Sequence, residues 1–280
     1  MPIASASPDL PEHTFDTATR VTAGDSQWRG HTSDDYWAFI GPFGGFTAAT
    51  MLRSIVEHPQ REGDALSVTV NYCAPIAAGP FDLDVRLIKA NRSSQHWSVE
   101  LTQQGGETAA FATAVFAVRR PSWSHRPATR PDAPPFEQTR RFPSSSFKLS
   151  WIRQYDFRFI EGHPSFGGPP PGELASPFSK LWIGDNKPRR LDALSLTSMS
   201  DAFFARIFHV RGELVPFGTV SLTTYFHVDA EDLIAEDACQ VLAVADGNIF
   251  HKSYSDQTAA LWSPNGTLLA TSQQIAYFKV

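Results

Sequence analysis

Residues 44–72 read GGFTAATMLRSIVEHPQREGDALSVTVNY and contain the two patterns that decide the fold. The first is a set of apolar residues at the i, i+3, i+4, i+7 spacing of a helix with one apolar face: Ala48, Met51, Leu52 and Ile55. Pro59 ends this helix, because proline cannot continue one. Residues 67–72 then alternate between polar and apolar side chains, as a half-buried strand does. The stretch therefore predicts a helix followed by a strand.

Three more alternating runs follow this strand, at residues 81–87, 97–101 and 111–118. The last two are joined by Gln104-Gly105-Gly106-Glu107, which predicts a hairpin turn. Such a series is typical of an antiparallel meander with one buried face.

The same order returns later in the chain. Residues 191–208 predict a second helix with an apolar stripe formed by Leu196, Met199, Phe203 and Ile207. Strands are expected after it at 217–228, 239–245, 253–262 and 267–278. A long helix wrapped by a curved antiparallel sheet is the hotdog arrangement. The repeated pattern predicts an α+β fold of the double-hotdog type, with two helix-wrapped antiparallel sheets in one chain.

The chain divides at a stretch rich in proline. We expect an N-terminal hotdog at residues 14–120, a Pro-rich linker at 121–145 and a C-terminal hotdog at 146–280. Residues 162–177 form a second irregular stretch, which predicts a loop that could cover a pocket.

Composition excludes several classes of protein. The 24 Lys and Arg residues against 29 Asp and Glu residues give a net charge of −5, which argues against nucleic-acid binding. The two cysteines and the polar N-terminus fit a cytoplasmic protein, and no run is long and apolar enough for a membrane span. Glycine-rich nucleotide loops are absent and the nine histidines have no metal-binding spacing, so we expect no cofactor and no metal.

Asp201 is the first candidate for chemistry. Within the predicted helix it shares a face with Leu194, Phe204 and Phe208, so its carboxylate is expected to be desolvated. Desolvation raises the pKa of a carboxyl group and makes it a better base near neutral pH. The alternative is a structural role, in which Asp201 caps a shorter helix that begins at Ala202.

Two residues of the predicted strands complete the candidates. Gln274 shares the parity of the apolar residues of the last strand, so its amide is expected to be buried and hydrogen-bonded to the protein, to a ligand or to water. Thr219 has the opposite parity to the apolar run that begins at Val220. It faces the same way as that run only if a β-bulge intervenes.

Four short motifs resemble those of the acyl-CoA thioesterase II family, the bacterial TesB type of double-hotdog thioesterase. Ile40-Gly41-Pro42-Phe43-Gly44-Gly45 is similar to the segment that enters the family's first helix, and residues 200–204 (SDAFF) are similar to its Ser-Asp-x-x-Phe helix. Residues 225–227 (YFH) are similar to its Trp-Phe-His strand, and residues 265–274 (NGTLLATSQQ) to its terminal hairpin.

The resemblance implies hydrolysis of an acyl-CoA to a free acid and CoA. The family uses an Asp, a Thr and a Gln around one water molecule, and these roles fall on Asp201, Thr219 and Gln274. It also implies that Gly44, Gly45 and Phe204 bind the substrate, and that the protein is a homo-oligomer, a dimer or larger. The sequence departs from the family at residues 220–222, 228–229 and 265, which leaves the acyl and CoA preference open.

Three alternatives stay open at this point. A hotdog dehydratase or hydratase would need a His paired with an Asp or Glu, and no His has a convincing partner motif. A specialised thioesterase acting on a carrier-bound, polyketide-like acyl thioester would use the same residues. A non-catalytic acyl-CoA binder would bind the ligand without releasing thiol.

Overall fold

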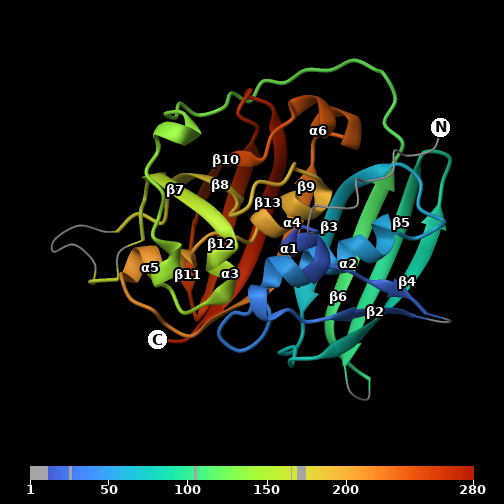
Figure 1. Ribbon diagram of the computed structural model, residues 1–280, viewed down its shortest axis with the longest axis horizontal. Coiled ribbons are helices and arrows are strands. Elements are labelled where there is room, and N and C mark those ends of the chain that lie inside the picture. Colours follow the sequence, from blue (N-terminus) through green and yellow to red (C-terminus); the bar gives the residue numbers. More distant parts are fainter. Residues whose placement is uncertain (1–11, 25–26, 104–105, 165, 169–174) are drawn as a thin grey trace.

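The computed structural model describes residues 12–24, 27–103, 106–164, 166–168 and 175–280 (Figure 1). Among these residues, the first half contains the α-helices α1 (Thr14–Ala18) and α2 (Gly44–Val56) and the 3₁₀ helix η1 (Asp34–Tyr36). Its strands are β1 (Thr22–Ala23), β2 (Trp28–His31), β3 (Asp64–Tyr72), β4 (Pro80–Ala90), β5 (Ser94–Gln103) and β6 (Glu107–Ala117). The predicted first helix and its four strands are confirmed.

The second half follows an irregular segment, and its described residues contain four further α-helices. These are α3 (Ser150–Arg153), α4 (Ala193–Met199), α5 (Arg206–Arg211) and α6 (Ala230–Glu236). Its strands are β7 (Tyr155–Glu161), β8 (Ser179–Asp185), β9 (Phe217–Phe226), β10 (Gln240–Asp246), β11 (Phe250–His251), β12 (Tyr254–Trp262) and β13 (Leu268–Phe278). The four strands predicted after residue 216 are confirmed.

Within the described residues, 13 strands join one antiparallel sheet in the order β1-β2-β4-β5-β6-β3-β9-β13-β12-β10-β8-β7, with β11 beside β12. The expected division into two separate sheets is therefore wrong. β3 pairs with β9 over five residues, from Ser67↔Tyr225 to Asn71↔Ser221, and this pairing leaves no free edge at the centre.

The two halves repeat the same strand order about this central pair. Outward from the centre, the first half places β3, β6, β5 and β4, and the second places β9, β13, β12 and β10. In each half the first strand after α2 or α4 is innermost, namely β3 or β9. The last strand of that half, β6 or β13, lies next to it. The repeat is one of topology, as the sequence pattern predicted.

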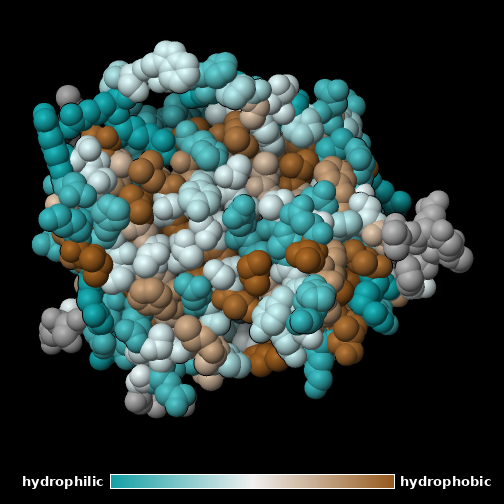
Figure 2. Space-filling view, turned by 180° about the vertical axis from the view of Figure 1, so that it is seen from behind, coloured by the Kyte–Doolittle hydropathy of each residue, from teal (hydrophilic) through white to brown (hydrophobic). Residues whose placement is uncertain are grey.

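Helices α2 and α4 lie against each other in front of the same face of the sheet (Figure 1). The predicted apolar face of α2 is confirmed, because Ala48, Met51, Leu52 and Ile55 are all at most 1% exposed. Figure 2 shows the molecule from behind, on the side opposite to these helices, where hydrophilic and hydrophobic side chains are mixed. The main apolar core therefore lies between the helices and the sheet.

The prediction of a single helix at residues 191–208 is wrong. The chain forms α4, leaves the helix after Ser200 and starts α5 only at Arg206. Two side chains of the stripe, Phe203 and Ile207, are buried as predicted, although they do not belong to the same helix as Leu196. The hydroxyl of Ser200 donates to the Leu196 carbonyl, a local bond by which serine competes with helical backbone pairing.

The sequence patterns did not predict β7 and β8. In β8 six of the seven residues are buried, so the alternation that marks a half-exposed strand is absent. Residues 121–145, the predicted linker, contain no α-helix or strand; the 3₁₀ turn Phe136–Gln138 lies within them and a second, Ser144–Ser146, begins at their end. The domain boundaries remain a prediction. The predicted turn at 104–107 and loop at 162–177 lie partly outside the described residues. Within the described part of the chain, every helix is too short or too polar to span a bilayer.

Candidate functional site

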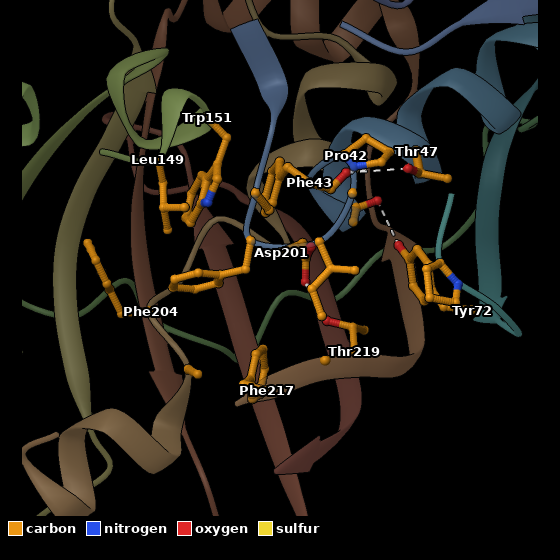
Figure 3. A pocket seen from close by; sticks show the side chains of 18 of the residues that line it. Pro42, Phe43, Thr47, Tyr72, Leu149, Trp151, Asp201, Phe204, Phe217 and Thr219 are labelled. Carbon is orange, nitrogen blue, oxygen red and sulfur yellow. Dashed lines mark hydrogen bonds between the residues drawn. The ribbon is translucent and has the colours of Figure 1, made fainter. Parts of the chain in front are cut away.

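A cavity of about 760 Å³ opens between the two halves of the molecule (Figure 3). The first half contributes the segment that enters α2 and the end of β3. The second half contributes residues 147–152, the segment between α4 and α5, and parts of β9 and β13. Asp201, Thr219 and Gln274 all line this cavity, so the structure brings the three sequence candidates together.

The three side chains form one hydrogen-bonded group. The Gln274 amide nitrogen Nε2 donates to Thr219 Oγ1 at 2.9 Å and to Asp201 Oδ1. The Thr219 hydroxyl lies 3.5 Å from the same Asp201 oxygen. Asp201 and Gln274 are each 7% exposed, so this group is shielded from bulk water but open to the cavity.

A β-bulge orients Thr219. Along the pairing of β9 with β13, Ile275 is opposite Ser221 while Ala276 is opposite Thr219, so Val220 is the extra residue. The extra residue reverses the alternation and puts Thr219 on the buried side of the sheet with Gln274. The sequence predicted that Thr219 would face the same way as the apolar run only if a β-bulge intervened, and the structure contains this bulge.

Asp201 reaches the site because the chain leaves the helical path after α4. It lies one residue beyond the C-cap Ser200, not inside a helix, and the expected shared face with Leu194 and Phe208 therefore does not exist. Its burial is nevertheless as predicted. No helix begins at Ala202, since α5 starts four residues later, so the predicted alternative of a cap at that position is wrong.

Asp201 instead interacts with the N-terminus of α2 in the other half. The N-cap of α2, Phe43, offers no side-chain hydrogen bond, and no acidic residue lies in the first turn. The backbone N–H of Gly45 is hydrogen-bonded to the Asp201 carboxylate. A carboxylate at this place satisfies one of the free N–H groups of the helix start and interacts favourably with the helix dipole.

Two glycines make this close approach possible. A Cβ atom on Gly44 would lie 2.6 Å from Asp201 Oδ2, and one on Gly45 would lie 2.5 Å from the Ser198 carbonyl oxygen. Both distances are too short for a real Cβ contact, so only glycine lets α2 begin this near to Asp201 and to α4. Gly44 lines the cavity, and Gly45 lies behind it, buried.

Burial sets the protonation of Asp201. Desolvation raises the pKa of its carboxyl group to about 7, even though the hydrogen bonds from Gly45, Gln274 and Thr219 act in the opposite direction. Near neutral pH the carboxylate, which can accept a proton, and the neutral acid are therefore both populated.

Aromatic side chains form one wall of the cavity. The rings of Phe43 and Trp151 are stacked, with centroids 4.3 Å apart and an interplanar angle of 5°. Phe204 lines the same wall and packs against Trp151 and Phe147. In Figure 3 Trp151 and Phe204 lie on one side of Asp201, and Tyr72 lies on the other.

Sequence reasoning missed Tyr72, Trp151 and Lys148, which also line the cavity. Tyr72 ends a predicted strand on its apolar parity, and that position was the available signal. Lys148 is the basic residue among those that line the cavity. Among the residues that the structure describes, no group of three or more His, Cys, Asp and Glu side chains could hold a metal ion.

Comparison with known families accounts for most of the chain. The family model for the acyl-CoA thioesterase N-terminal domain matches residues 33–117, and that for the acyl-CoA thioesterase C-terminal domain matches residues 124–278. No curated protein matches the sequence.

Solved structures share the fold over nearly the whole chain. A conserved protein of unknown function with a hot dog fold, from Alicyclobacillus acidocaldarius, is 38% identical, with a TM-score of 0.90 over 96% of this chain and 99% of that one. A putative thioesterase II from Thermobifida fusca is 19% identical, with a TM-score of 0.82 and coverage of 97% and 99%. The acyl-CoA thioesterase II TesB2 from Mycobacterium marinum is 18% identical, with a TM-score of 0.72 and coverage of 95% and 98%. At these two lower identities the likeness concerns the fold alone.

Proposed function

The chain belongs to the acyl-CoA thioesterase family, and from this premise we propose that it hydrolyses an acyl-CoA to a free acid and CoA with Asp201 as the general base. The observation that carries the proposal is the buried group of Asp201, Thr219 and Gln274 at the wall of an apolar cavity. We also propose that each half of the chain is one hotdog unit, with residues 121–145 as the linker, since both halves repeat one strand order.

The reaction uses a water molecule as the nucleophile. Ionised Asp201 accepts a proton from the water while its oxygen attacks the thioester carbonyl carbon. Gln274 and Thr219 hold the carboxylate and the water in the geometry of attack, which lowers the entropic part of the barrier. The tetrahedral intermediate then expels the CoA thiolate as the C–S bond breaks, and protonated Asp201 returns its proton to the sulfur.

The oxyanion of that intermediate needs hydrogen-bond donors. The first N–H groups of α2 point out of the helix start at this end of the cavity, where the helix dipole also favours negative charge. Because the Gly45 N–H is used by Asp201, we assign the oxyanion to the N–H of Gly44, which lines the cavity.

The cavity walls favour hydrolysis over the alternatives. The aromatic wall built by Phe43, Trp151 and Phe204 suits an acyl chain. The described residues that line the cavity include no histidine, whereas a hotdog dehydratase or hydratase is expected to use one. A non-catalytic binder would not need a buried ionisable group such as Asp201 at the wall of an apolar cavity.

Asp201→Asn is the direct test. It keeps the shape of the side chain but removes the base, so turnover of a medium-chain acyl-CoA is expected to fall at least about 100-fold with the fold unchanged. Asp82→Asn, a partly exposed residue of β4 outside the cavity, is the matched control. Free CoA and enoyl-CoA are measured together by chromatography.

Three results would count against the proposal. Near-normal activity of the D201N protein removes Asp201 from the role of base. Formation of enoyl-CoA without free CoA supports the dehydratase alternative. Tight binding of acyl-CoA by the wild-type protein with no thiol release supports the non-catalytic binder.

A further inference from the structure

The peptide group between Gly44 and Gly45 is hydrogen-bonded at both of its ends. The Tyr72 hydroxyl donates to the carbonyl oxygen of Gly44 at 2.7 Å (Figure 3). The N–H of the same peptide group belongs to Gly45 and is hydrogen-bonded to Asp201. Tyr72 and Asp201 are thus joined by one chain of two hydrogen bonds that passes through a single peptide plane.

We propose that Tyr72 is a positioning residue for Asp201 and acts on it through the peptide group between Gly44 and Gly45. The inference rests on the proposed function, because it assigns Tyr72 a part in supporting the general base. Tyr72 ends β3 in the first half of the chain, whereas Asp201 follows α4 in the second half. The contact therefore crosses the boundary between the two halves at the site itself.

Two physical effects give Tyr72 this role. A hydrogen bond to a carbonyl oxygen polarises the peptide and makes its N–H a stronger donor, so the Tyr72 bond strengthens the bond from Gly45 to the carboxylate. It also fixes the direction of the peptide plane. This peptide lies at the start of α2, where Phe43 offers no side-chain cap.

The space around Gly44 shows how closely the three groups are packed. A Cβ atom built on Gly44 would lie 2.6 Å from Asp201 Oδ2 and 3.3 Å from the Tyr72 hydroxyl oxygen. The Asp201 carboxylate oxygen and the Tyr72 hydroxyl oxygen therefore both lie close to the side of Gly44 on which a Cβ atom would stand.

The other groups that face Asp201 do not titrate in the range of interest. Burial raises the pKa of both Tyr72 and Tyr155 well above the ordinary value for tyrosine, so both phenols stay neutral. Gln274 and Thr219 are not ionisable in this range. Lys148 and Cys73 also line the cavity, so the titration is followed at Asp201 itself.

Tyr72→Phe is the test, because it removes the donor and keeps the ring. With a weaker bond from Gly45 the carboxylate is less stabilised, so the acid limb of the pH profile of kcat/KM moves to higher pH, by roughly half to one unit. At pH 7 kcat falls about two- to fivefold and KM stays within about twofold. Tyr254→Phe, an exposed tyrosine of β12 outside the cavity, is the matched control and leaves the profile unchanged.

A second measurement does not depend on turnover. The ¹³Cγ resonance of Asp201, identified by its loss in the D201N protein, is followed through the same pH range in wild type and Y72F. A shift of the midpoint to higher pH in Y72F supports the inference even if no thioester is cleaved, so the two proposals can fail separately.

Two results overturn the inference. Midpoints of Asp201 that coincide in the wild-type and Y72F proteins show that the peptide does not transmit the contact. A large rise in KM with an unmoved acid limb shows that Tyr72 acts on the substrate directly. Circular dichroism and thermal melting of Y72F establish that either result is obtained on folded protein.

Discussion

The pH dependence of hydrolysis follows from the burial of Asp201. Desolvation raises the pKa of this carboxyl group from the ordinary 3.8 to about 7, and only the ionised form can accept a proton from water. The acid limb of kcat/KM, which reports the free enzyme, is therefore expected to have its midpoint near pH 7.

The size of the effect separates a buried base from an exposed one. With a pKa of about 7, about one tenth of the molecules are ionised at pH 6 and about one hundredth at pH 5. The value of kcat/KM at pH 5 is therefore expected to be about 100-fold below its plateau. A carboxylate with the ordinary pKa would lose only about 6% of its ionised form at pH 5.

The assay measures free CoA by chromatography at fixed times, because thiol reagents respond to pH themselves. Initial rates at low substrate concentration are taken from about pH 5 to pH 9, with circular dichroism at each pH to exclude unfolding. The D201N protein provides the comparison, since its residual rate should show no limb near pH 7. A wild-type profile that stays flat down to pH 5 would refute the assignment of the buried Asp201 as the base.

Three other perturbations test separate parts of the site and fold. Gly44→Ala places a Cβ atom 2.6 Å from Asp201 Oδ2, so kcat is expected to fall at least about tenfold; an unchanged kcat would show that the close approach is not needed. Lys148→Ala is expected to raise KM for an acyl-CoA about threefold or more, because its positive charge attracts the CoA phosphates. KM for the matching acyl-pantetheine, which lacks those phosphates, should stay the same. Lys89→Ala, outside the cavity, is the control and should change KM for neither substrate. Burial raises the pKa of Asp185 to about 7, so its contribution to stability is present below about pH 4 and is lost as the pH rises through 7. The melting temperature of D185N should accordingly fall less than that of wild type between about pH 4 and pH 8, and equal slopes would contradict this.

The period-2 pattern predicted strands that have one buried and one more exposed face, such as β9, β12 and β13. The period-3.6 pattern predicted the helix α2, although this helix is buried on nearly all sides, with ten of its 13 residues buried. The strand β8 is buried on both faces and gave no alternation to read. Joining the two halves into one sheet depends on the pairing of β3 with β9, and strands far apart in sequence carry no local signal of such pairing.

The candidate site was predictable in its residues but not in its construction. Parity indicated a buried Gln274, and burial of Asp201 was expected, although for the wrong reason. The periodicity of residues 191–208 continues through the break after Ser200, because Phe203 and Ile207 are still needed in the core. Beyond the end of α4, Asp201 interacts with the start of α2, a tertiary contact that local sequence does not encode.

The repeated topology explains why one site, rather than two, is expected in each chain. In the first half, β6 occupies the place that β13 has in the second, and its buried side chains are those of alanine and phenylalanine, with no amide. Glu57 lies at the C-terminal end of α2, much as Asp201 lies just beyond the end of α4. Glu57 is partly exposed and paired with Arg53, so it is not a desolvated carboxylate like Asp201.

The N-termini of α2 and α4 also differ between the two halves. The N-terminus of α4 is satisfied by its own capping box, formed by Asp192 and Ser195, whereas that of α2 has no cap in its own sequence. Among the described residues, the half that contains the uncapped α2 has no buried carboxylate, whereas Asp201 belongs to the half whose helix α4 is already capped. The base, the hydroxyl and the amide of one half therefore need the helix start and Tyr72 of the other, and separating the halves should leave neither with a complete site.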